Sequence, residues 1–388
     1  MIRTYTLALA AALWTGACAE YIGPTPAPGE LVQPIGITVH PSGRYVYVVN
    51  SNFNARYEVS AGGNIVVIDA DTLEPTTDEP YRFGSYGARV ILWGPDPLAP
   101  TTLGVAVRGD SGISLLQLTP DGGRVFCAST GVEDACSFQL GRDIYDLTPL
   151  PRPSLVPENF EYWMAAGLDG RVYLLSIPDG NLQRASVLVR GALSGNNVLR
   201  VFEPTSEVFI AGRFSNRIAA LSYFGQTDGE PGGIIINSQS QYPTTLGRAE
   251  IRDLRFSSDG TRAWVSAGSP SSLMTLDVRQ RDEGLATNQI LRRVDLDGGP
   301  AEMVVVTEDG RDTLYIALAD DEAIAVVDGQ TSELLDMIPL DALAFGLAAD
   351  TVRHQRLYVT LFDEDAVAVI DINPASPSFR SVIAEVRQ

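Results

Sequence analysis

The sequence predicts an all-β fold, a seven-bladed β-propeller of four-stranded antiparallel blades. A pair of apolar tetrads recurs along the chain, and successive copies lie about 50 residues apart, a period typical of propeller blades. The tetrads are rich in Val, Ile and Tyr, residues that favour strands. In addition, 36 Gly and 24 Pro residues supply the tight turns that many short strands require.

The repeat is clearest at the two ends of the chain. Tyr47–Asn50 precedes Val66–Asp69, and Tyr358–Leu361 precedes Ala368–Asp371. The weaker central copies include Trp163–Ala166, and six of the seven copies share an offset of ten residues between the ends of their two tetrads. The last residues of the second tetrads mark the seven copies as Asp69, Gln117, Ser176, Ser222, Asp277, Asp328 and Asp371.

Each copy is predicted to hold four strands. An apolar run such as Ile251–Phe256 forms the first strand, and a turn such as Ser258–Gly260 follows it because glycine tolerates the positive φ of a tight reversal. The tetrads form the second and third strands, and a run such as Leu334–Pro339 forms the fourth. Length alone suggests two or three domains, but the repeat predicts a single propeller domain over residues 34–388.

In its tetrad pairs and the hairpins between them, the chain resembles the YVTN-type β-propeller repeat family, which is related to exported bacterial surface-layer proteins. The resemblance covers about residues 34–388 and is strongest at both ends. Six copies lack the tetrad asparagine, and the second to fourth copies lack the aspartate. The resemblance implies the propeller fold and leaves the activity open, because propellers carry unrelated functions.

The N-terminus has the features of an export signal over residues 1–17. Arg3 precedes the apolar run Leu7–Trp14, and small residues follow, which is the order typical of a secretory signal. The apolar run is too short to span a bilayer as a helix.

Two processing routes remain open. Thr15–Cys18 resembles a bacterial lipobox, in which Cys18 becomes the lipidated first residue, and Ala19 after it favours the outer membrane. Alternatively, cleavage before Glu20 gives a periplasmic or secreted protein. Residues 18–33 are rich in Pro and Gly and are interpreted as a tether.

The two remaining cysteines, Cys127 and Cys136, lie nine positions apart. An exported chain meets an oxidising compartment, so we expect a disulfide between them. The alternative is two unrelated thiols. A zinc site is less well supported because no histidine lies nearby to complete a tetrahedral ligand set.

Charge and composition exclude several function classes. The net charge is −20, with 48 acidic and 28 basic residues, which argues against nucleic acid as a partner. We expect membrane contact only through a lipid anchor. The two histidines, His40 and His354, give little support for haem, copper or a serine triad. We therefore expect that the protein is not an enzyme and has no cofactor, with calcium alone left open.

Two acidic hairpin tips occupy the same place in adjacent copies. Their oxygen ligands make a candidate calcium site, and the six residues are Asp320, Asp321, Glu322, Asp363, Glu364 and Asp365. Two alternatives are solvated hairpin tips and a paired-carboxylate hydrolase.

Loops are the other candidate binding surface. The insertion after the first tetrad carries Asn52, Phe53 and Tyr57, and the Cys127–Cys136 loop is expected on the same face. We expect a monomeric, non-catalytic cell-envelope propeller that binds a protein or a glycan through this face. The alternatives are a hydrolase or lactonase with a divalent cation at the channel mouth, and a structural surface-layer component.

Overall fold

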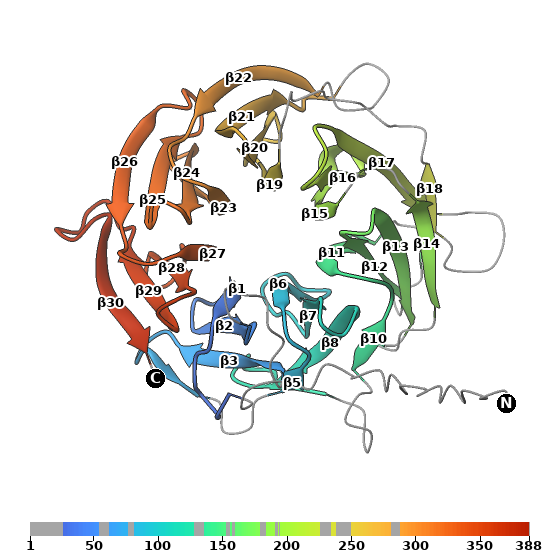
Figure 1. Cartoon of the computed structure of the whole chain (residues 1–388), viewed down its shortest axis with the longest axis horizontal. Helices are drawn as coiled ribbons and strands as arrows, with labels where there is room; N and C mark the ends of the chain where they lie inside the picture. The colour runs from blue at the N-terminus through green and yellow to red at the C-terminus, as the bar shows by residue number, and fades with distance from the viewer. Residues whose placement is uncertain are drawn as a thin grey trace, which may run out of the picture.

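The computed structural model describes residues 26–53, 62–76, 81–127, 136–152, 156, 160–178, 184–190, 193, 195–225, 234–237, 250–280 and 288–387. These residues form 30 strands and one short 3-10 turn, η1 (Glu203–Thr205). The strands make seven antiparallel sheets arranged in a ring (Figure 1). The predicted seven-bladed β-propeller is therefore confirmed.

The first two blades each carry a split outer edge. Blade 1 contains β1 (Pro34–Val39), β2 (Tyr45–Asn50), β3 (Gly63–Asp69), β4 (Glu74–Pro75) and β5 (Arg82–Phe83). Blade 2 contains β6 (Gly87–Trp93), β7 (Thr102–Val107), β8 (Gly112–Leu118), β9 (Val125–Phe126) and β10 (Ser137–Gln139).

The other five blades have four strands each. Blade 3 contains β11 (Ile144–Leu150), β12 (Phe160–Gly167), β13 (Arg171–Pro178) and β14 (Arg184–Arg190). Blade 4 contains β15 (Asn196–Phe202), β16 (Glu207–Gly212), β17 (Ile218–Gly225) and β18 (Ile234–Asn237). Blade 5 contains β19 (Ile251–Phe256), β20 (Arg262–Gly268), β21 (Ser271–Asp277) and β22 (Gln289–Asp295). Blade 6 contains β23 (Pro300–Glu308), β24 (Arg311–Leu318), β25 (Ala323–Asp328) and β26 (Leu334–Pro339). Blade 7 contains β27 (Ala344–Asp350), β28 (Arg356–Leu361), β29 (Ala366–Asp371) and β30 (Ser381–Arg387).

The predicted disulfide between Cys127 and Cys136 is present, with the two Cα atoms 5.8 Å apart. Cys127 directly follows β9 and Cys136 directly precedes β10, and both of these short strands pair with β8. The disulfide therefore joins the two halves of the outer edge of blade 2.

The ring closes without a strand shared between its ends, because each blade is built from consecutive residues. Instead, the segment before β1 bridges blades 7 and 1. The backbone N–H of Gln33 donates to Asp365 in the β28–β29 hairpin (2.6 Å). Asn50 of β2 accepts from the N–H of Val32 (3.0 Å) and donates to the carbonyl oxygen of Glu30 (2.7 Å). Leu31 is buried in the core between these two blades.

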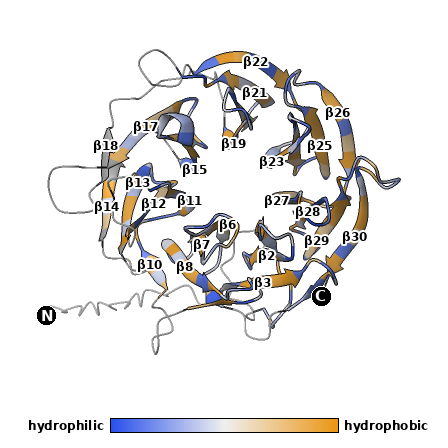
Figure 2. Cartoon of the chain, turned by 180° about the vertical axis from the view of Figure 1, so that it is seen from behind, coloured by the Kyte–Doolittle hydropathy of each residue, from blue (hydrophilic) through white to orange (hydrophobic). Residues whose placement is uncertain are grey.

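The core lies between neighbouring blades, where the tetrad strands are buried on both faces; β3, β25 and β29 are largely hydrophobic in Figure 2. The first residue of the first tetrad is a buried aromatic that packs toward the next blade in five blades. These residues are Tyr47, Phe209, Trp264, Tyr315 and Tyr358.

Blades 2 and 3 depart from this rule in a compensating way. In blade 2 the position is Gly104, and a Cβ atom there would lie 2.6 Å from the ring of Trp163. In blade 3, strand pairing aligns Gly167 with Ile144, so the tetrad runs over Met164–Gly167. The expected assignment Trp163–Ala166 is therefore wrong by one residue. A one-residue slip reverses the face to which a side chain points, and Trp163 consequently fills the space that Gly104 leaves.

We predict that Gly104→Ala destabilises the protein by about 1 to 3 kcal/mol, because the added methyl group overpacks the core. Its Cβ would lie 2.6 Å from Trp163 and 2.8 Å from Leu147. The measurement is chemical denaturation of the wild type, both single variants and the double variant Gly104→Ala/Trp163→Phe. The cost of Gly104→Ala should be smaller in the Trp163→Phe background; equal costs would show that the ring does not set this limit.

Candidate binding site at the loop face of the channel

The innermost strands of the seven blades surround the central channel (Figure 1). The first strand of every blade contains a β-bulge near its start. A bulge re-aims the side chain at that point, and one residue from each bulge lines a cavity at one mouth of the channel. From blade 1 to blade 7 these residues are Ile35, Ala88, Tyr145, Asn197, Arg252, Ala301 and Phe345.

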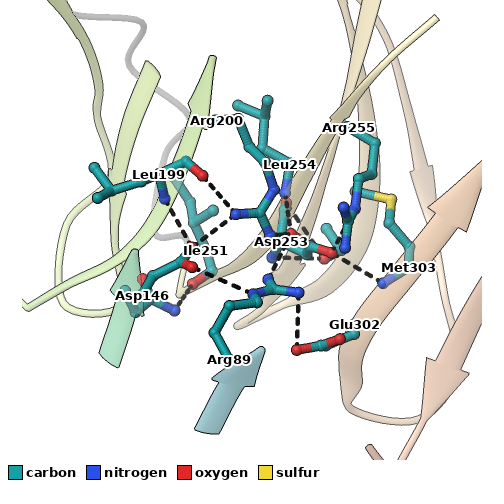
Figure 3. Close-up of polar contacts among 12 residues, drawn as sticks. Arg89, Asp146, Leu199, Arg200, Ile251, Asp253, Leu254, Arg255, Glu302 and Met303 are labelled. Atoms are coloured by element: carbon teal, nitrogen blue, oxygen red, sulfur yellow. Dashed lines mark hydrogen bonds and ion pairs between the residues drawn. The ribbon is translucent and has the colours of Figure 1, made fainter. Parts of the chain in front are cut away.

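Below this ring of residues, charged side chains from five blades meet across the channel (Figure 3). We call this group the charge layer; it consists of Arg89, Asp146, Arg200, Asp253, Arg255 and Glu302. Three guanidinium groups face three carboxylates, so the layer is balanced in charge.

Arg89 of β6 joins the three carboxylates of the charge layer. Its guanidinium lies 3.3 Å from Asp146 of β11, 3.3 Å from Asp253 of β19 and 3.0 Å from Glu302 of β23. Arg200 of β15 bridges the same two aspartates and lies 2.7 Å from Asp146. Arg255 donates to Asp253 at 3.1 Å.

The two aspartates also cross-link neighbouring blades through the backbone. Asp146 accepts from the N–H of Leu199 in blade 4 (2.9 Å), and Asp253 accepts from the N–H of Met303 in blade 6 (3.1 Å). Both side chains are fully buried. A buried carboxylate is tolerated when charged partners and hydrogen bonds replace its hydration, and each of these aspartates has both.

The pKa values follow from burial and pairing. Although burial disfavours the charged form, the charges of Arg200, Arg255 and Arg89 hold the pKa of Asp253 well below its usual range. Burial lowers the pKa of Arg255 to about 10, against the opposing charge of Asp253. Burial also raises the pKa of Glu302 above its usual value, with Arg89 acting in the other direction.

The charge layer separates two cavities. The cavity on the side of the β2–β3 and blade-to-blade loops, which we call the loop-face cavity, has a volume of about 340 Å³. The one on the opposite side, the turn-face cavity, has a volume of about 620 Å³ and is lined by Trp93, several prolines, Arg200 and Arg255. Arg89 lines both cavities.

One side of the loop-face cavity is aromatic. The ring of Phe53, just after β2, lies 4.3 Å from Tyr86 and 5.3 Å from Phe362, measured between centroids. Phe345 of β27 lies 5.4 Å from Phe362. All four residues line the cavity, so blades 7 and 1 and the start of blade 2 present a continuous arc of rings.

The other side of this cavity is basic. Arg213 follows β16, and Arg252 belongs to β19. Arg252 pairs with Glu250 at 2.9 Å. Burial lowers the pKa of Arg252, and the nearby charge of Arg213 lowers it further. Arg108 stands between the two sides, over the rings of Tyr86 and Tyr145 at 5.4 and 5.7 Å.

The structure places the predicted loop residues as follows. Phe53 lines the loop-face cavity. Asn52 is buried and donates to the carbonyl oxygen of Gly62 (2.6 Å), which ties together the base of the insertion. Tyr57 lies outside the described residues, as do Cys18 and the predicted signal at 1–17. In the part of the chain that is described, there is no helix long and apolar enough to cross a membrane.

The six acidic hairpin residues are not brought together as a metal site. Asp320 lines the loop-face cavity; Asp363 accepts from the N–H of Leu343 (2.8 Å), and Glu364 pairs with Arg387 (2.8 Å). Asp365 is used in ring closure, whereas Asp321 and Glu322 lie at the other tip. Over the described ranges, no group of three or more His, Cys, Asp or Glu side chains is arranged to hold a metal ion. The structure thus offers no support for the calcium expectation.

The charge layer was missed in the sequence because its members are spread over the first strands of five blades, with one or two in each strand. One signal was present: Arg89, Asp146, Asp253 and Glu302 all occur near the start of the first strand of their blade, in successive or alternate repeats. An isolated charge in a buried strand requires a partner, and the repeat places these strands around one axis.

Comparison with known proteins supports the fold alone. No family model matches the chain, and no curated protein matches it. Among solved structures, a Kuenenia stuttgartiensis hydrazine synthase chain has a TM-score of 0.60 at 13% identity, covering 92% of this chain and 100% of that chain. The β-propeller domain of Myceliophteria thermophila Cps50 (Swd1) has a TM-score of 0.62 at 11% identity, with coverages of 91% and 100%. Saccharomyces cerevisiae Sqt1 has a TM-score of 0.57 at 13% identity, with coverages of 94% and 87%.

These likenesses define the class of protein: it is a seven-bladed β-propeller. Membership of the YVTN-type repeat family stays a prediction.

We predict that Asp253→Asn destabilises the protein by about 3 to 5 kcal/mol, because it leaves buried guanidinium groups uncompensated. Chemical denaturation at neutral pH measures the loss. The control is Asp71→Asn, which removes an exposed carboxylate paired with Arg353 (2.6 Å) and should change stability far less. Equal losses would show that the charge layer has no special role.

The pH dependence of stability provides a second test. The pKa of Asp253 is depressed in the folded state, so its contribution is complete above the ordinary aspartate pKa of about 3.9 and declines as the pH falls below it. The difference in unfolding free energy between wild type and Asp253→Asn should therefore shrink between about pH 5 and pH 2. A difference that is constant over this range would contradict the assignment.

Proposed function

We propose that this chain is an exported, non-catalytic binding propeller of the cell envelope and that its loop-face cavity is the binding site for a glycan or protein group. The observation that carries this proposal is the architecture of the cavity. Its floor is closed by a charge-balanced network, and its walls present aromatic rings on one side and arginines on the other.

Several features favour ligand binding here. The volume of about 340 Å³ falls in the range of small-molecule and recognition pockets. The wall residues are fixed by strands or by close ring packing, which lowers the entropy cost of binding. The loops around the mouth come from several blades, and loops on a rigid scaffold commonly carry recognition.

The enzyme alternative has one observation in its favour. Glu302 lies in the cavity with a raised pKa caused by burial, which is the environment of many general acids. However, its carboxylate is paired with Arg89 at 3.0 Å, and this pairing favours a structural role. A hydrazine synthase chain shares the fold, but propellers host both enzymes and binding proteins.

We predict that Phe345→Leu weakens ligand capture at least fivefold, because it removes one ring of the aromatic arc while keeping an apolar side chain. The measurement is retention of the mature chain on a panel of immobilised cell-envelope glycans and cross-linking to envelope proteins. The matched control is Val352→Ala, an exposed apolar residue in the β27–β28 turn of the same blade.

Retention that Phe345→Leu reduces and Val352→Ala preserves supports the proposal. Equal retention by both variants, or no retention by wild type, overturns it. Light scattering of the mature chain addresses the surface-layer alternative, which requires self-association into arrays.

For the envelope anchor, we predict that Cys18→Ser moves the protein from the membrane fraction to the soluble fraction. Cys18 ends the lipobox-like sequence Thr15–Cys18, and serine has no thiol to accept a lipid. Cell fractionation and radiolabelled fatty-acid incorporation measure this outcome. Wild-type protein that is soluble and unlabelled would favour simple secretion with cleavage before Glu20.

A further inference from the structure

The loop-face cavity holds more positive charge than its own carboxylates balance. Arg213 is half-buried at the start of the β16–β17 hairpin, and its backbone N–H donates to the carbonyl oxygen of Gly195 (2.6 Å). Throughout the described ranges no carboxylate lies within ion-pair distance of its guanidinium. Arg252 beside it has one such partner, Glu250. The two guanidinium groups therefore have one ion-paired carboxylate among the described residues, Glu250, and the carboxylate of Asp320 in the cavity wall acts on Arg252 at longer range.

This surplus favours an anionic ligand group. The neighbouring charge of Arg213 lowers the pKa of Arg252, after the larger effect of burial, whereas Glu250 and Asp320 act in the other direction; the two cations therefore repel each other. A carboxylate placed between them would relieve that repulsion and accept charge-assisted hydrogen bonds from planar donors suited to it.

A second polar feature lies next to these arginines. Asn197 of β15 lines the cavity and is only 3% exposed. Its Nδ2 donates to the carbonyl oxygen of Ile251 (2.9 Å), whereas its buried Oδ1 has no hydrogen-bond partner in the described structure. A buried acceptor left unpaired is costly, and a rotation of this side chain toward the cavity would let a ligand hydroxyl group satisfy it.

The aromatic wall, across the cavity from these arginines, is suited to bind a ring whose faces carry C–H groups. The centroids of Phe345, Phe362, Phe53 and Tyr86 follow one another at 5.4, 5.3 and 4.3 Å. The faces of aromatic rings carry partial negative charge, and the C–H groups of a sugar ring carry partial positive charge. A sugar ring can therefore pack against this arc.

We propose that the loop-face cavity binds a carboxylate-bearing sugar, either free or at the end of an acidic glycan. The sugar ring lies against the aromatic arc, the carboxylate meets Arg213 and Arg252, and a hydroxyl group donates to Asn197. This inference rests on the proposed function, because it names the ligand class of the same cavity.

Isothermal titration calorimetry with the mature full chain tests the inference, using glucuronate, glucose and benzoate as probes. Glucuronate should bind at least tenfold more tightly than glucose, which lacks the carboxylate, and than benzoate, which lacks hydroxyl groups. A glucuronate-terminated oligosaccharide, compared with free glucuronate, distinguishes a glycan end from a free sugar acid.

The matched variants are Arg213→Gln and Arg217→Gln. Arg217 lies in the same hairpin, is exposed and is not part of the cavity wall, so both variants lose the same charge from the same loop. Arg213→Gln should weaken glucuronate binding at least tenfold and leave glucose binding unchanged, whereas Arg217→Gln should bind both as the wild type does. Thermal melting confirms that both variants are folded.

Glucuronate binding equal to that of glucose, or equal losses in the two variants, overturns the assignment of the carboxylate to Arg213. Benzoate binding as tight as that of glucuronate overturns the proposal that the ligand is a sugar. If no acidic sugar binds while another ligand is retained in a manner sensitive to Phe345→Leu, the inference fails and the proposed function stands. If nothing is retained at all, both fail.

Discussion

The ion pairs among Arg89, Asp146 and Asp253 connect blades that share no strand. Seven sheets that meet around an axis leave a channel, and a channel lined only by short apolar side chains would contain a void or water. Here the channel is filled at mid-height by three arginines and three carboxylates from five blades. This layer provides the floor of the loop-face cavity and fixes the inner strands relative to one another through the amides of Leu199 and Met303.

The fold could be predicted from the sequence because the same pair of apolar tetrads recurs from blade to blade. Each copy of the tetrad pair reports the same two buried strands, so weak central copies are supported by strong terminal ones. The error at Trp163 shows the limit of this reasoning. The offset of ten residues does not reveal that the β12–β13 hairpin of blade 3 is shorter. The pairing of Gly167 with Ile144 shows where the tetrad of this blade ends. The aromatic side chain then belongs to the opposite interface, where it compensates for Gly104.

The loop-face cavity could be predicted only in part from the sequence. Phe53 was expected on a loop face and lies there, because insertions between the second and third strands emerge at one end of a blade. Arg213, Arg252 and Asn197 could not be grouped in advance, because they come from different strands and hairpins of blades 4 and 5 and their meeting depends on ring geometry. The bulges in β15 and β19 aim Asn197 and Arg252 at the channel mouth, and a bulge leaves little signature in sequence apart from a shifted alternation.

Ring closure has a consequence for how such a chain could diverge. The terminal blades are joined by packing and by the hydrogen bonds of Gln33 and Asn50, and every sheet is made of consecutive residues. No sheet therefore depends on which blade comes first along the chain, because only the loops between blades set that order. A gene rearranged to begin at a different blade would encode the same seven sheets, with new ends between two other blades and a peptide link between blades 7 and 1.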